Sequence, residues 1–367
     1  MANGVTIGEP TTDLMTVAAC AERGAVRLES RPRPEPGPGE MLLALRCAGL
    51  CGTDLFKIHY GTVPPGTVLG HEVVGTVEAL GAGVTGFTPG DRVVVPHHVA
   101  CGECALCRRG SETLCPVFRE NLLSPGGFSD RVLVRERAVR RAAFGLPDHV
   151  TDEAAVFLEP AACVLRGIRH ARLAELAVSG PPGSPPVAVV LGGGSMGLLH
   201  VLVLQVLFPD LRIVVSEPLE ERRALALRLG AAAAVAPEAA RAAVEALSGG
   251  LGADVAFDTV GGVGPLDAAL ALTREGGTVV LFAHAPGSGA SSERAGFDLN
   301  AFFKSERKLI ATYSSALPEQ REIYRLLATR RLDPSPLVTH RLPLSRLAEG
   351  IELSRERHAL KVLLTPG

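Results

Sequence analysis

A glycine-rich loop between two apolar runs constrains the fold of this chain more than any other feature. The loop spans residues 192–197, with the sequence GGGSMG, and it lies between the apolar runs 187–191 and 198–207. Its G-x-G-x-x-G spacing lets backbone N–H groups approach a pyrophosphate at the amino end of a helix. Strand, loop and helix together predict the first unit of a dinucleotide-binding domain.

Further strand-like runs follow the loop and alternate with helical patterns. The strand-like runs are residues 212–215, 254–257, 278–282 and 309–313, and the helical patterns include 219–229 and 237–247. Such βαβα alternation is typical of a parallel, doubly wound sheet. We therefore expect an α/β cofactor domain in the second half of the chain.

The second strand of this domain ends at Glu217, about twenty positions after Gly197. A carboxylate there can accept hydrogen bonds from the ribose hydroxyls and would repel a 2′-phosphate, so NAD is favoured over NADP. Arg222 and Arg223 leave a second interpretation open, because they could bind that phosphate or lie on a solvated helix face. The expected cofactor-binding residues are Gly192, Gly194, Met196, Gly197, Glu217 and Arg222.

Four of the eight cysteines lie within one short stretch. Cys101, Cys104 and Cys107 are spaced C-x-x-C-x-x-C, and Cys115 follows. Four thiolates at this spacing predict a closed, tetrahedral zinc site. Because such a site has no open position, its expected role is to hold a lobe of the protein rather than to do chemistry.

A second set of possible ligands is more dispersed. Cys51, the pair His71-Glu72 and Glu159 offer a thiolate, an imidazole and two carboxylates. This combination can hold zinc and still leave room for water or an alcohol. Spacing alone leaves open whether these residues bind metal or have structural roles.

Length and composition are consistent with two domains in a chain of 367 residues. Residues from about 16 to 141 combine strand-like runs, such as 41–47 and 92–95, with turns rich in Pro and Gly, which predicts a mainly β domain. The tail from 318 to 366 contains two helical segments and the apolar run 360–364. That run has no sheet of its own and is expected to return to the first domain.

The charge balance points to a small ligand. With 37 basic and 39 acidic residues, the net charge of −2 favours neither nucleic acid nor an anionic membrane as a partner. No apolar run reaches the roughly 18 residues of a membrane span. Residues 1–14 lack the features of a secretory signal and are interpreted as a loose extension, so a cytoplasmic location is expected.

Taken together, these motifs resemble those of the zinc-containing medium-chain dehydrogenase/reductase superfamily. The segments 49–54 (GLCGTD), 70–72 (GHE) and 90–93 (GDRV), the four cysteines and the glycine loop occur in the family's order. The resemblance implies a GroES-like, mainly β catalytic domain and a Rossmann cofactor domain. It implies a division into residues 1–164, 165–313 and a return to the catalytic domain at 314–367.

The resemblance also implies roles for residues of the dispersed set. It places a catalytic zinc on Cys51 and His71, with Glu72 able to enter the coordination shell and Glu159 in the third or exchanging place. Thr53 matches the position whose hydroxyl takes the alcohol proton. Asp54 is interpreted as a support for the metal loop.

Three further positions bear on the proton path and the pocket. Many relatives have a histidine five residues after the zinc cysteine, whereas this chain has Phe56; His59 could substitute for it or be an ordinary loop residue. His97 matches a substrate-pocket position. Cys163, a fourth position, is expected to be a core thiol.

Segment 118–128, which ends in PGGF, resembles the sorbitol- and iditol-dehydrogenase-like branch, and Glu159 resembles the glutamate of the polyol, sugar and threonine dehydrogenase branches. The implied substrate is a small alcohol: a polyol, cyclitol or sugar oxidised to a ketone. The Arg-Tyr pair with which sorbitol dehydrogenases hold substrate is Thr312-Tyr313 here, which disfavours sorbitol itself. An L-threonine or simple alcohol dehydrogenase and a non-catalytic nucleotide-binding relative remain alternatives. A homodimer or homotetramer is expected.

Overall fold

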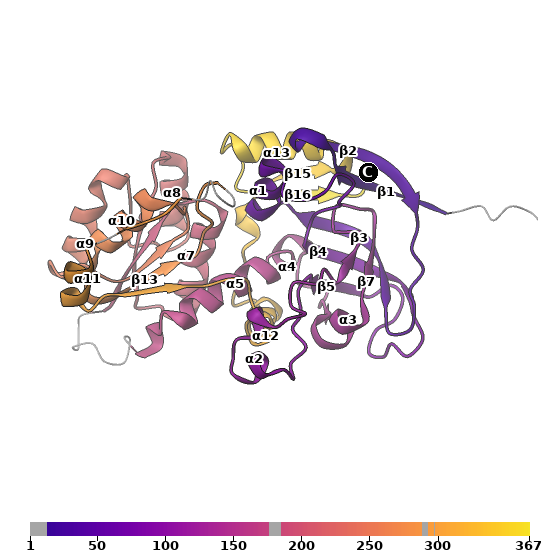
Figure 1. Ribbon diagram of the computed structural model, residues 1–367, viewed down its shortest axis with the longest axis horizontal. Coiled ribbons are helices and arrows are strands. Elements are labelled where there is room, and N and C mark those ends of the chain that lie inside the picture. The colour runs from indigo at the N-terminus through magenta and orange to yellow at the C-terminus, as the bar shows by residue number, and fades with distance from the viewer. Residues whose placement is uncertain (1–12, 176–184, 288–292, 297) are drawn as a thin grey trace, which may run out of the picture.

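The computed structural model describes residues 13–175, 185–287, 293–296 and 298–367. Its secondary structure is organised around two large sheets that lie side by side, one parallel and one mostly antiparallel (Figure 1). The fold-class prediction is therefore confirmed. Within the described ranges, no helix combines the length and the apolar character that a bilayer crossing requires.

The parallel sheet has six strands in the order β11-β10-β9-β12-β13-β14. Its strands are β9 (Val187–Leu191), β10 (Arg212–Ser216), β11 (Ala233–Val235), β12 (Ala253–Asp258), β13 (Thr273–Leu281) and β14 (Lys308–Ala311). Its helices are α7 (Ser195–Leu207), α8 (Glu220–Arg228), α9 (Ala240–Ser248), α10 (Val263–Leu272) and α11 (Leu299–Ser305), with a 3-10 turn at Pro237–Ala239. The strand predicted at 309–313 ends two residues early, because Ala311 pairs with Leu281, where β13 ends.

Alternate residues of β9 face opposite sides of this sheet. Ala188 and Val190 pack in one core cluster with residues of α7, whereas Val187, Val189 and Leu191 pack in another with residues of α9 and α10. Because side chains alternate along a strand, a strand covered by helices on both faces is apolar throughout. This explains the unbroken apolar run 187–191.

The second sheet has eight strands, six of them in the order β15-β16-β3-β4-β5-β8, with β7 also paired to β3 and β6 paired to β7. The strands are β3 (Met41–Gly49), β4 (Glu72–Leu80), β5 (Arg92–Pro96), β6 (Leu123–Ser124), β7 (Arg131–Val134), β8 (Phe144–Gly145), β15 (Val338–Pro343) and β16 (Lys361–Thr365). A separate hairpin joins β1 (Leu14–Cys20) to β2 (Val26–Pro32). Leu14, which was expected to belong to a loose extension, is thus already in a strand; residues 1–12 lie outside the described part.

The helices outside the parallel sheet are α1 (Gly52–Tyr60), α2 (Ala105–Arg108), α3 (Glu136–Ala142), α4 (Asp152–Ala155), α5 (Leu158–His170), α12 (Leu317–Ala328) and α13 (Leu347–Arg355). Shorter 3-10 turns are at Glu22–Gly24, Glu112–Leu114, Ser335–Leu337 and Leu344–Arg346. The last strand, β16, pairs antiparallel with β3, with Leu364 opposite Ala48, and parallel with β15. The start of β16 therefore lies beside the loop that follows β3, where the backbone N–H of Leu50 donates to the carbonyl oxygen of Val362.

A histidine lies in the core between the parallel sheet and α7. His200 is fully buried, its ring contacts Phe257 and Phe282, and its Nδ1 lies 2.8 Å from the carbonyl oxygen of Met196. Burial lowers the pKa of this imidazole from 6.5 to about 4. The folded state therefore keeps His200 neutral over a range in which the unfolded chain binds a proton.

This histidine predicts a loss of stability in acid. The contribution of the neutral His200 to the free energy of unfolding is fully present above pH 6.5 and is lost as the pH falls toward 4, because in this range only the unfolded chain binds the proton. The loss is on the order of 3 kcal/mol. Urea unfolding at pH 7 and pH 4.5 should show a smaller acid loss in His200→Met than in the wild type. The same change at the exposed His358 serves as a control, and equal pH dependence in all three proteins would contradict the prediction.

Candidate functional site

Two neighbouring strands bring Cys51, His71 and Glu72 together. Strand β3 ends at Gly49, which pairs with Glu72 at the start of β4, and Cys51 lies two residues beyond Gly49 as the N-cap of α1. One ligand atom from each of the three residues lies within 4.8 Å of the other two. A Cβ on Gly49 would lie only 1.9 Å from Glu72 Oε2, so this close approach requires glycine. The donor set of thiolate, imidazole and carboxylate fits a zinc ion.

The buried side chain of Asp54 supports the Cys51–His71–Glu72 group. It is fully buried, accepts hydrogen bonds from the backbone N–H groups of Cys51 (3.2 Å) and Gly70 (3.4 Å), and lies 3.3 Å from Nδ1 of His71. Burial opposes protonation of His71, but the charges of Asp54 and Cys51 together raise its pKa well above 6.5. These contacts agree with the expected supporting role of Asp54, and they leave Nε2 of His71 for a metal.

The carboxylate of Glu72 is paired with a lysine from the end of the chain. Lys361 Nζ lies 2.8 and 2.7 Å from the two oxygens of Glu72, and both side chains are buried. Sequence reasoning missed this partner, although Lys361 is the one charge in the apolar run 360–364. Glu72 can therefore enter a metal shell only by giving up part of its contact with Lys361.

Glu159 lies close by on α5 but outside the three-residue group. Burial raises the pKa of its carboxyl group, although the nearby charge of His71 opposes this, and Glu159 accepts a hydrogen bond from the thiol of Cys163 at 3.3 Å. Cys163 was expected to be only a core thiol, but it also donates a hydrogen bond to Glu159. Among the described residues, Cys51, His71 and Glu72 converge closely enough to share one ion, whereas Glu159 stays outside this group.

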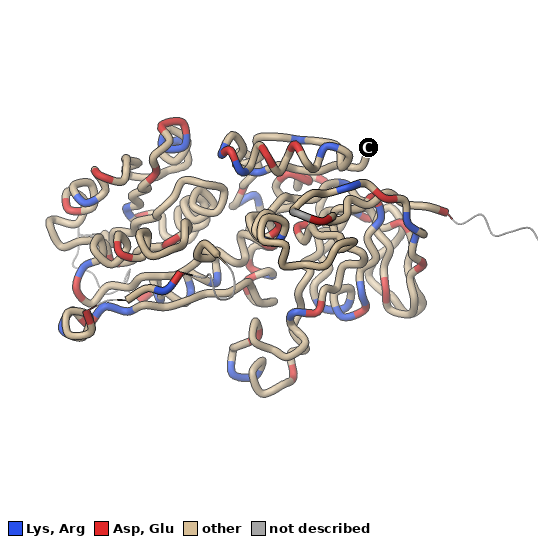
Figure 2. Tube along the Cα trace, turned by 45° about the horizontal axis from the view of Figure 1, so that its top comes forward, with Lys and Arg blue, Asp and Glu red and all other residues tan. Residues whose placement is uncertain are grey.

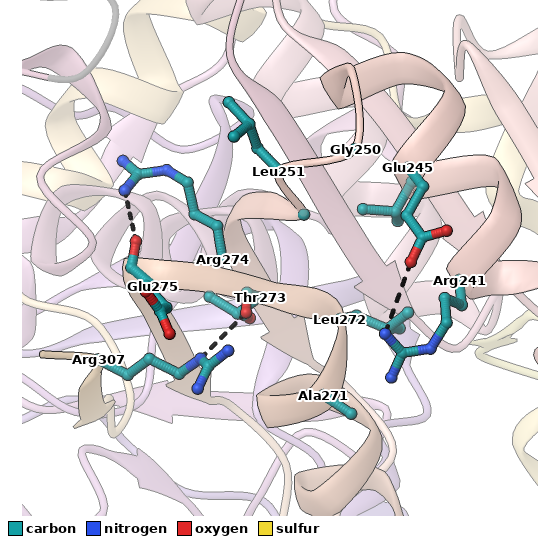
Figure 3. A pocket seen from close by; sticks show the side chains of 12 residues that line it. Arg241, Glu245, Gly250, Leu251, Ala271, Leu272, Thr273, Arg274, Glu275 and Arg307 are labelled. Atoms are coloured by element: carbon teal, nitrogen blue, oxygen red, sulfur yellow. Dashed lines mark hydrogen bonds and ion pairs between the residues drawn. The ribbon is translucent and has the colours of Figure 1, made fainter. Parts of the chain in front are cut away.

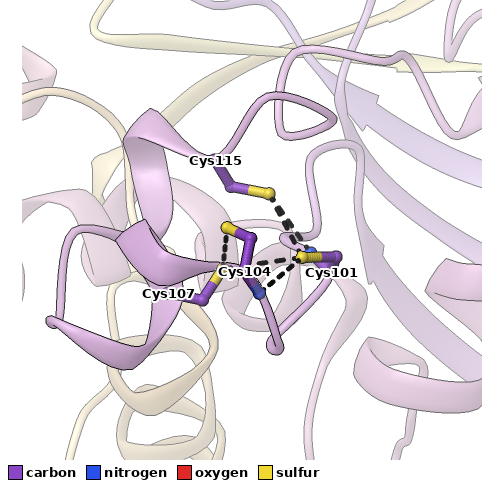
Figure 4. A group of neighbouring side chains, drawn as sticks. All are labelled: Cys101, Cys104, Cys107 and Cys115. Atoms are coloured by element: carbon purple, nitrogen blue, oxygen red, sulfur yellow. Dashed lines mark hydrogen bonds between the residues drawn. The ribbon is translucent and has the colours of Figure 1, made fainter.

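The four-cysteine stretch forms a compact cluster (Figure 4). The sulfur atoms of Cys101 and Cys107 are 3.9 Å apart, those of Cys104 and Cys107 are 3.5 Å apart, and those of Cys115 and Cys101 are 3.6 Å apart. Backbone N–H groups of Cys101 and Cys104 donate to the sulfurs of Cys115 and Cys101. Four converging thiols fit the structural zinc site that their spacing predicts.

The glycine loop has the close backbone approach that its sequence requires. A Cβ on Gly197 would lie 1.9 Å from the carbonyl oxygen of Gly192, so the first turn of α7 can meet the loop only at glycine. Helix α7 begins at Ser195 with no side-chain cap, which leaves its first N–H groups for an anion. Met196, in the first turn, is half-buried. This arrangement fits a dinucleotide pyrophosphate.

Glu217 lies beside that loop at the end of β10. Its side chain is buried and accepts hydrogen bonds from the backbone N–H groups of Gly193 (2.6 Å) and Leu219 (2.9 Å). Arg222 donates instead to the carbonyl oxygens of Arg357 and Ala359, in the segment that precedes β16. Arg223 donates to the carbonyl oxygens of Glu217 and Pro218. Both arginines therefore donate to backbone carbonyl groups. This differs from the two roles left open by the sequence, which were phosphate binding and exposure on a solvated helix face.

The first helix of the site carries the expected proton-path residues. Thr53 lies in the first turn of α1, half-buried. The ring of Phe56 stacks on His284, which follows β13, with centroids 5.3 Å apart. His59 is exposed and packs edge-on against Tyr60. The imidazole beside Phe56 is thus His284 rather than His59.

A pocket of about 160 Å³ lies elsewhere on the cofactor domain (Figure 3). It is lined by the residues that precede β12 and β14 and the first residues of β13, at the amino ends of these strands. Its three arginines are engaged with neighbours: Arg241 with Glu245, Arg274 with Asp254, and Arg307 with the carbonyl oxygen of Thr273. Ligands of doubly wound sheets bind at the carboxyl ends of the strands, so this pocket is not the cofactor site.

Comparison with known proteins agrees with this geometry. Residues 37–144 match the family model "Alcohol dehydrogenase GroES-like domain", and residues 196–329 match "Zinc-binding dehydrogenase". Sorbitol dehydrogenase of Gallus gallus is 31% identical over 352 residues, 93% of each chain. D-altritol 5-dehydrogenase of Agrobacterium fabrum (strain C58) is 33% identical, and the match covers 89% of this chain and 92% of the relative. L-threonine 3-dehydrogenase of Anaeromyxobacter sp. (strain Fw109-5) is 29% identical, and the match covers 94% of this chain and 96% of the relative.

Solved structures agree as well. Alcohol dehydrogenase TADH from Thermus sp. ATN1 superposes with a TM-score of 0.81 at 29% identity, over 96% of this chain and 100% of the other. A zinc-binding dehydrogenase from Sinorhizobium meliloti 1021, bound to NADP, superposes with a TM-score of 0.80 at 27% identity and the same coverage. These similarities extend over both sheets of the structure.

The two cysteine-containing groups predict different consequences when their thiols are removed. We expect the wild type to bind two zinc ions per chain. Cys101→Ser should lose one ion and lower the Tm, because ligand binding supplies much of the folding energy of such a lobe. Cys51→Ser should lose the other ion and all turnover with little change in Tm.

Elemental analysis together with thermal unfolding checks both expectations. The buried Cys20, which lies in β1 outside both groups, provides the control, since Cys20→Ala should retain two zinc ions. A single zinc ion per wild-type chain would contradict the assignment of two sites.

Proposed function

Because the chain belongs to the zinc-binding alcohol dehydrogenase family, we propose that it oxidises a secondary hydroxyl of a polyol, cyclitol or sugar to a ketone, reversibly and with NAD. The family assignment makes the protein a zinc-dependent alcohol or polyol dehydrogenase. The observation that carries the narrower proposal is the buried Glu159, a carboxylate beside the Cys51–His71–Glu72 group. A carboxylate in this place resembles the polyol, sugar and threonine dehydrogenase branches, and the 31% and 33% identities to a sorbitol and an altritol dehydrogenase favour the polyol branch among them.

The residues of the metal group have separable tasks in this reaction. Bound zinc would polarise the oxygen of the alcohol and lower the pKa of its hydroxyl. Cys51 and His71 would hold the metal with Glu72 or Glu159. Asp54 orients the His71 ring, and Lys361 keeps the charge of Glu72 compensated when that carboxylate is not a ligand. Thr53 offers a hydroxyl to accept and pass on the alcohol proton.

The side chains around the glycine loop support NAD as the cofactor. The carboxylate of Glu217 is held beside Gly193 by two backbone N–H groups, where a ribose 2′-phosphate would be repelled. The guanidinium groups of Arg222 and Arg223, which could otherwise bind that phosphate, already donate to backbone carbonyls. We therefore expect a higher kcat/KM with NAD than with NADP.

Replacing Glu217 tests the cofactor proposal. Glu217→Ala should lower the ratio of kcat/KM with NAD to kcat/KM with NADP, because the change removes both an acceptor for the ribose hydroxyls and the repulsion of a 2′-phosphate. The measurement is kcat/KM with each cofactor at a saturating alcohol concentration. Arg223→Met is the matched control and should leave the preference unchanged. A wild-type preference for NADP would overturn the proposal and give Arg222 or Arg223 the role of phosphate ligand.

A neutral small molecule suits the charge distribution of the protein. Basic and acidic residues are interspersed along both domains, and the net charge is −2 (Figure 2). This distribution offers no large field of one sign to nucleic acid or a membrane surface.

The substrate proposal is tested by a screen of NAD reduction. Polyols, cyclitols, aldoses, L-threonine and simple alcohols should be compared by kcat/KM, and a polyol, cyclitol or sugar is expected to lead. If ethanol or threonine exceeded every polyol by about tenfold, roughly 1.4 kcal/mol in transition-state binding, the polyol proposal would fail. The alternative functions named above, an L-threonine or simple alcohol dehydrogenase, would then be favoured.

We also propose that two copies of the chain associate through the outer edge of the parallel sheet. Strand β14 is the last in the strand order, and an edge strand has unpaired backbone groups. In the preceding helix, α11, the side chains of Leu299 and Phe303 are 76% and 79% exposed one turn apart. An apolar surface of this kind next to an open strand favours a second copy of the same chain.

Light scattering at micromolar concentration should give a dimer or a tetramer. Phe303→Glu should shift the protein toward the monomer, because it places a charge in the apolar contact. Leu227, which is 50% exposed on α8 beside β11 at the opposite edge of the sheet, offers the control Leu227→Glu, which should not change the mass. A monomeric wild type would refute association.

A further inference from the structure

One turn of helix α5 carries both Glu159 and Cys163. Residues four positions apart lie on the same face of a helix, and the thiol of Cys163 donates to Oε1 of Glu159 at 3.3 Å. In the described part of the chain, the buried carboxylate of Glu159 has no other hydrogen-bond partner. One of its two oxygens is therefore held by the thiol, and the other is free for a further partner.

The thiol is in turn supported by the segment that leaves the parallel sheet. The hydroxyl of Ser315, between β14 and α12, lies within hydrogen-bonding reach of the Cys163 sulfur. Nε2 of Gln320 donates to Oγ of Ser315 at 3.4 Å, and both of these side chains are buried. A hydroxyl and a thiol each have one proton to donate, so Ser315 can accept from Gln320 and donate to the sulfur. The donors thus point in one direction, toward the carboxylate of Glu159.

The packing of α12 on α5 fixes this segment. Ser314 has a φ of 55°, in the left-handed region that residues other than glycine rarely adopt. Such a conformation persists where the surrounding contacts determine it. Glu319 of α12 provides contacts of this kind, because its carboxylate lies 2.8 Å from Nη1 of Arg169 and 3.6 Å from Nη1 of Arg166, both on α5. The position of Ser315 is therefore set by two helices and not by a mobile loop.

The two carboxylates beside the candidate metal group are held in different ways. Glu72 is bound through both oxygens by the ammonium group of Lys361, at 2.8 and 2.7 Å. Glu159 is bound through one oxygen by a thiol, which is a weak donor. The free oxygen of Glu159 can meet an ion without breaking any of these contacts, whereas Glu72 would have to give up part of its ion pair. The hydrogen bond from Cys163 therefore leaves Glu159 both anchored and available.

We propose that Cys163 is a positioning residue for the metal site, which holds one oxygen of Glu159 so that the other can bind zinc or a water molecule on zinc, and that Ser315 and Gln320 support its thiol. This inference rests on the proposed function, since it assumes a zinc ion at the candidate metal group. Carboxylates that bind a metal are themselves hydrogen-bonded, and the loss of such a partner typically weakens metal binding roughly 10- to 100-fold.

The affinity for zinc tests this positioning role without any substrate. Competition with a chromophoric chelator gives the Kd of each ion, and the ion that Cys51→Ser lacks identifies the site concerned. Cys163→Ala should raise the Kd of that ion by about tenfold or more, because Glu159 loses its anchor. Cys163→Ser restores a donor and should bind zinc nearly as tightly as the wild type. Cys20→Ala removes a buried thiol outside both groups and should leave the Kd unchanged.

A second background shows whether the thiol acts through Glu159. In Glu159→Ala, the further change Cys163→Ala should cause no additional loss of zinc affinity, because the group that the thiol positions is absent. Equal losses in both backgrounds would mean that Cys163 only supports the fold. Ser315→Ala should raise the Kd in the same direction but by less than Cys163→Ala, and it tests the inference even if Cys163→Ala does not fold.

The outcomes separate this inference from the proposed function. An unchanged or lower Kd in Cys163→Ala, or the same increase in Cys163→Ala and Cys163→Ser, would overturn the positioning role. If the wild type held no ion at Cys51, the inference would fail together with the assignment of that site. If the zinc-loaded wild type oxidised no alcohol in the screen, only the proposed function would fail, because the chelator competition uses no alcohol.

Discussion

The buried carboxylate of Asp54 is the contact on which the rest of the candidate site depends. It accepts hydrogen bonds from the backbone N–H groups of Cys51 and Gly70 and faces Nδ1 of His71. A buried charge is costly unless donors surround it, so the two loops are confined to the one arrangement in which these three groups converge. The same contact sets the orientation of the His71 ring and leaves its other nitrogen for a metal. The geometry of the candidate metal group is thus imposed by a residue that does not belong to it.

Charge balance links this site to the far end of the chain. Glu72 would be a second buried carboxylate beside Asp54, and its compensation comes from Lys361 in the last strand. Replacing both residues of a buried ion pair by apolar groups can leave the stability of the fold unchanged, but removing one partner destabilises the fold because it leaves an uncompensated buried charge. The pairing of β16 with β3 therefore does more than complete a sheet, since it places the ammonium group of Lys361 beside Glu72. Arg222 adds a link from the cofactor domain to the segment just before Lys361.

Sequence reasoning succeeded where the chemistry is local. The glycine loop, the four cysteines and the GHE segment around His71 are recognisable because their backbone geometry or ligand spacing is encoded within a few residues. The partners that come from distant segments were missed, as with Lys361 and His284. The arginine absent from position 312 is an instructive case: Tyr313 does have an arginine over its ring, but it is Arg119. Contacts between domains depend on the folded arrangement, and no local pattern carries them.

The two candidate metal groups are also not independent of each other. A closed four-cysteine cluster cannot take part in the reaction, yet Phe118, which packs against its cysteines, contacts the ring of His98, and the rings of His98 and His97 continue this contact to His71. Zinc bound by the four thiols would supply folding energy to this lobe. Because the lobe holds Phe118 in its core and the backbone of His97 accepts a hydrogen bond from Leu122, that energy would also limit the movement of the rings beside the candidate metal group.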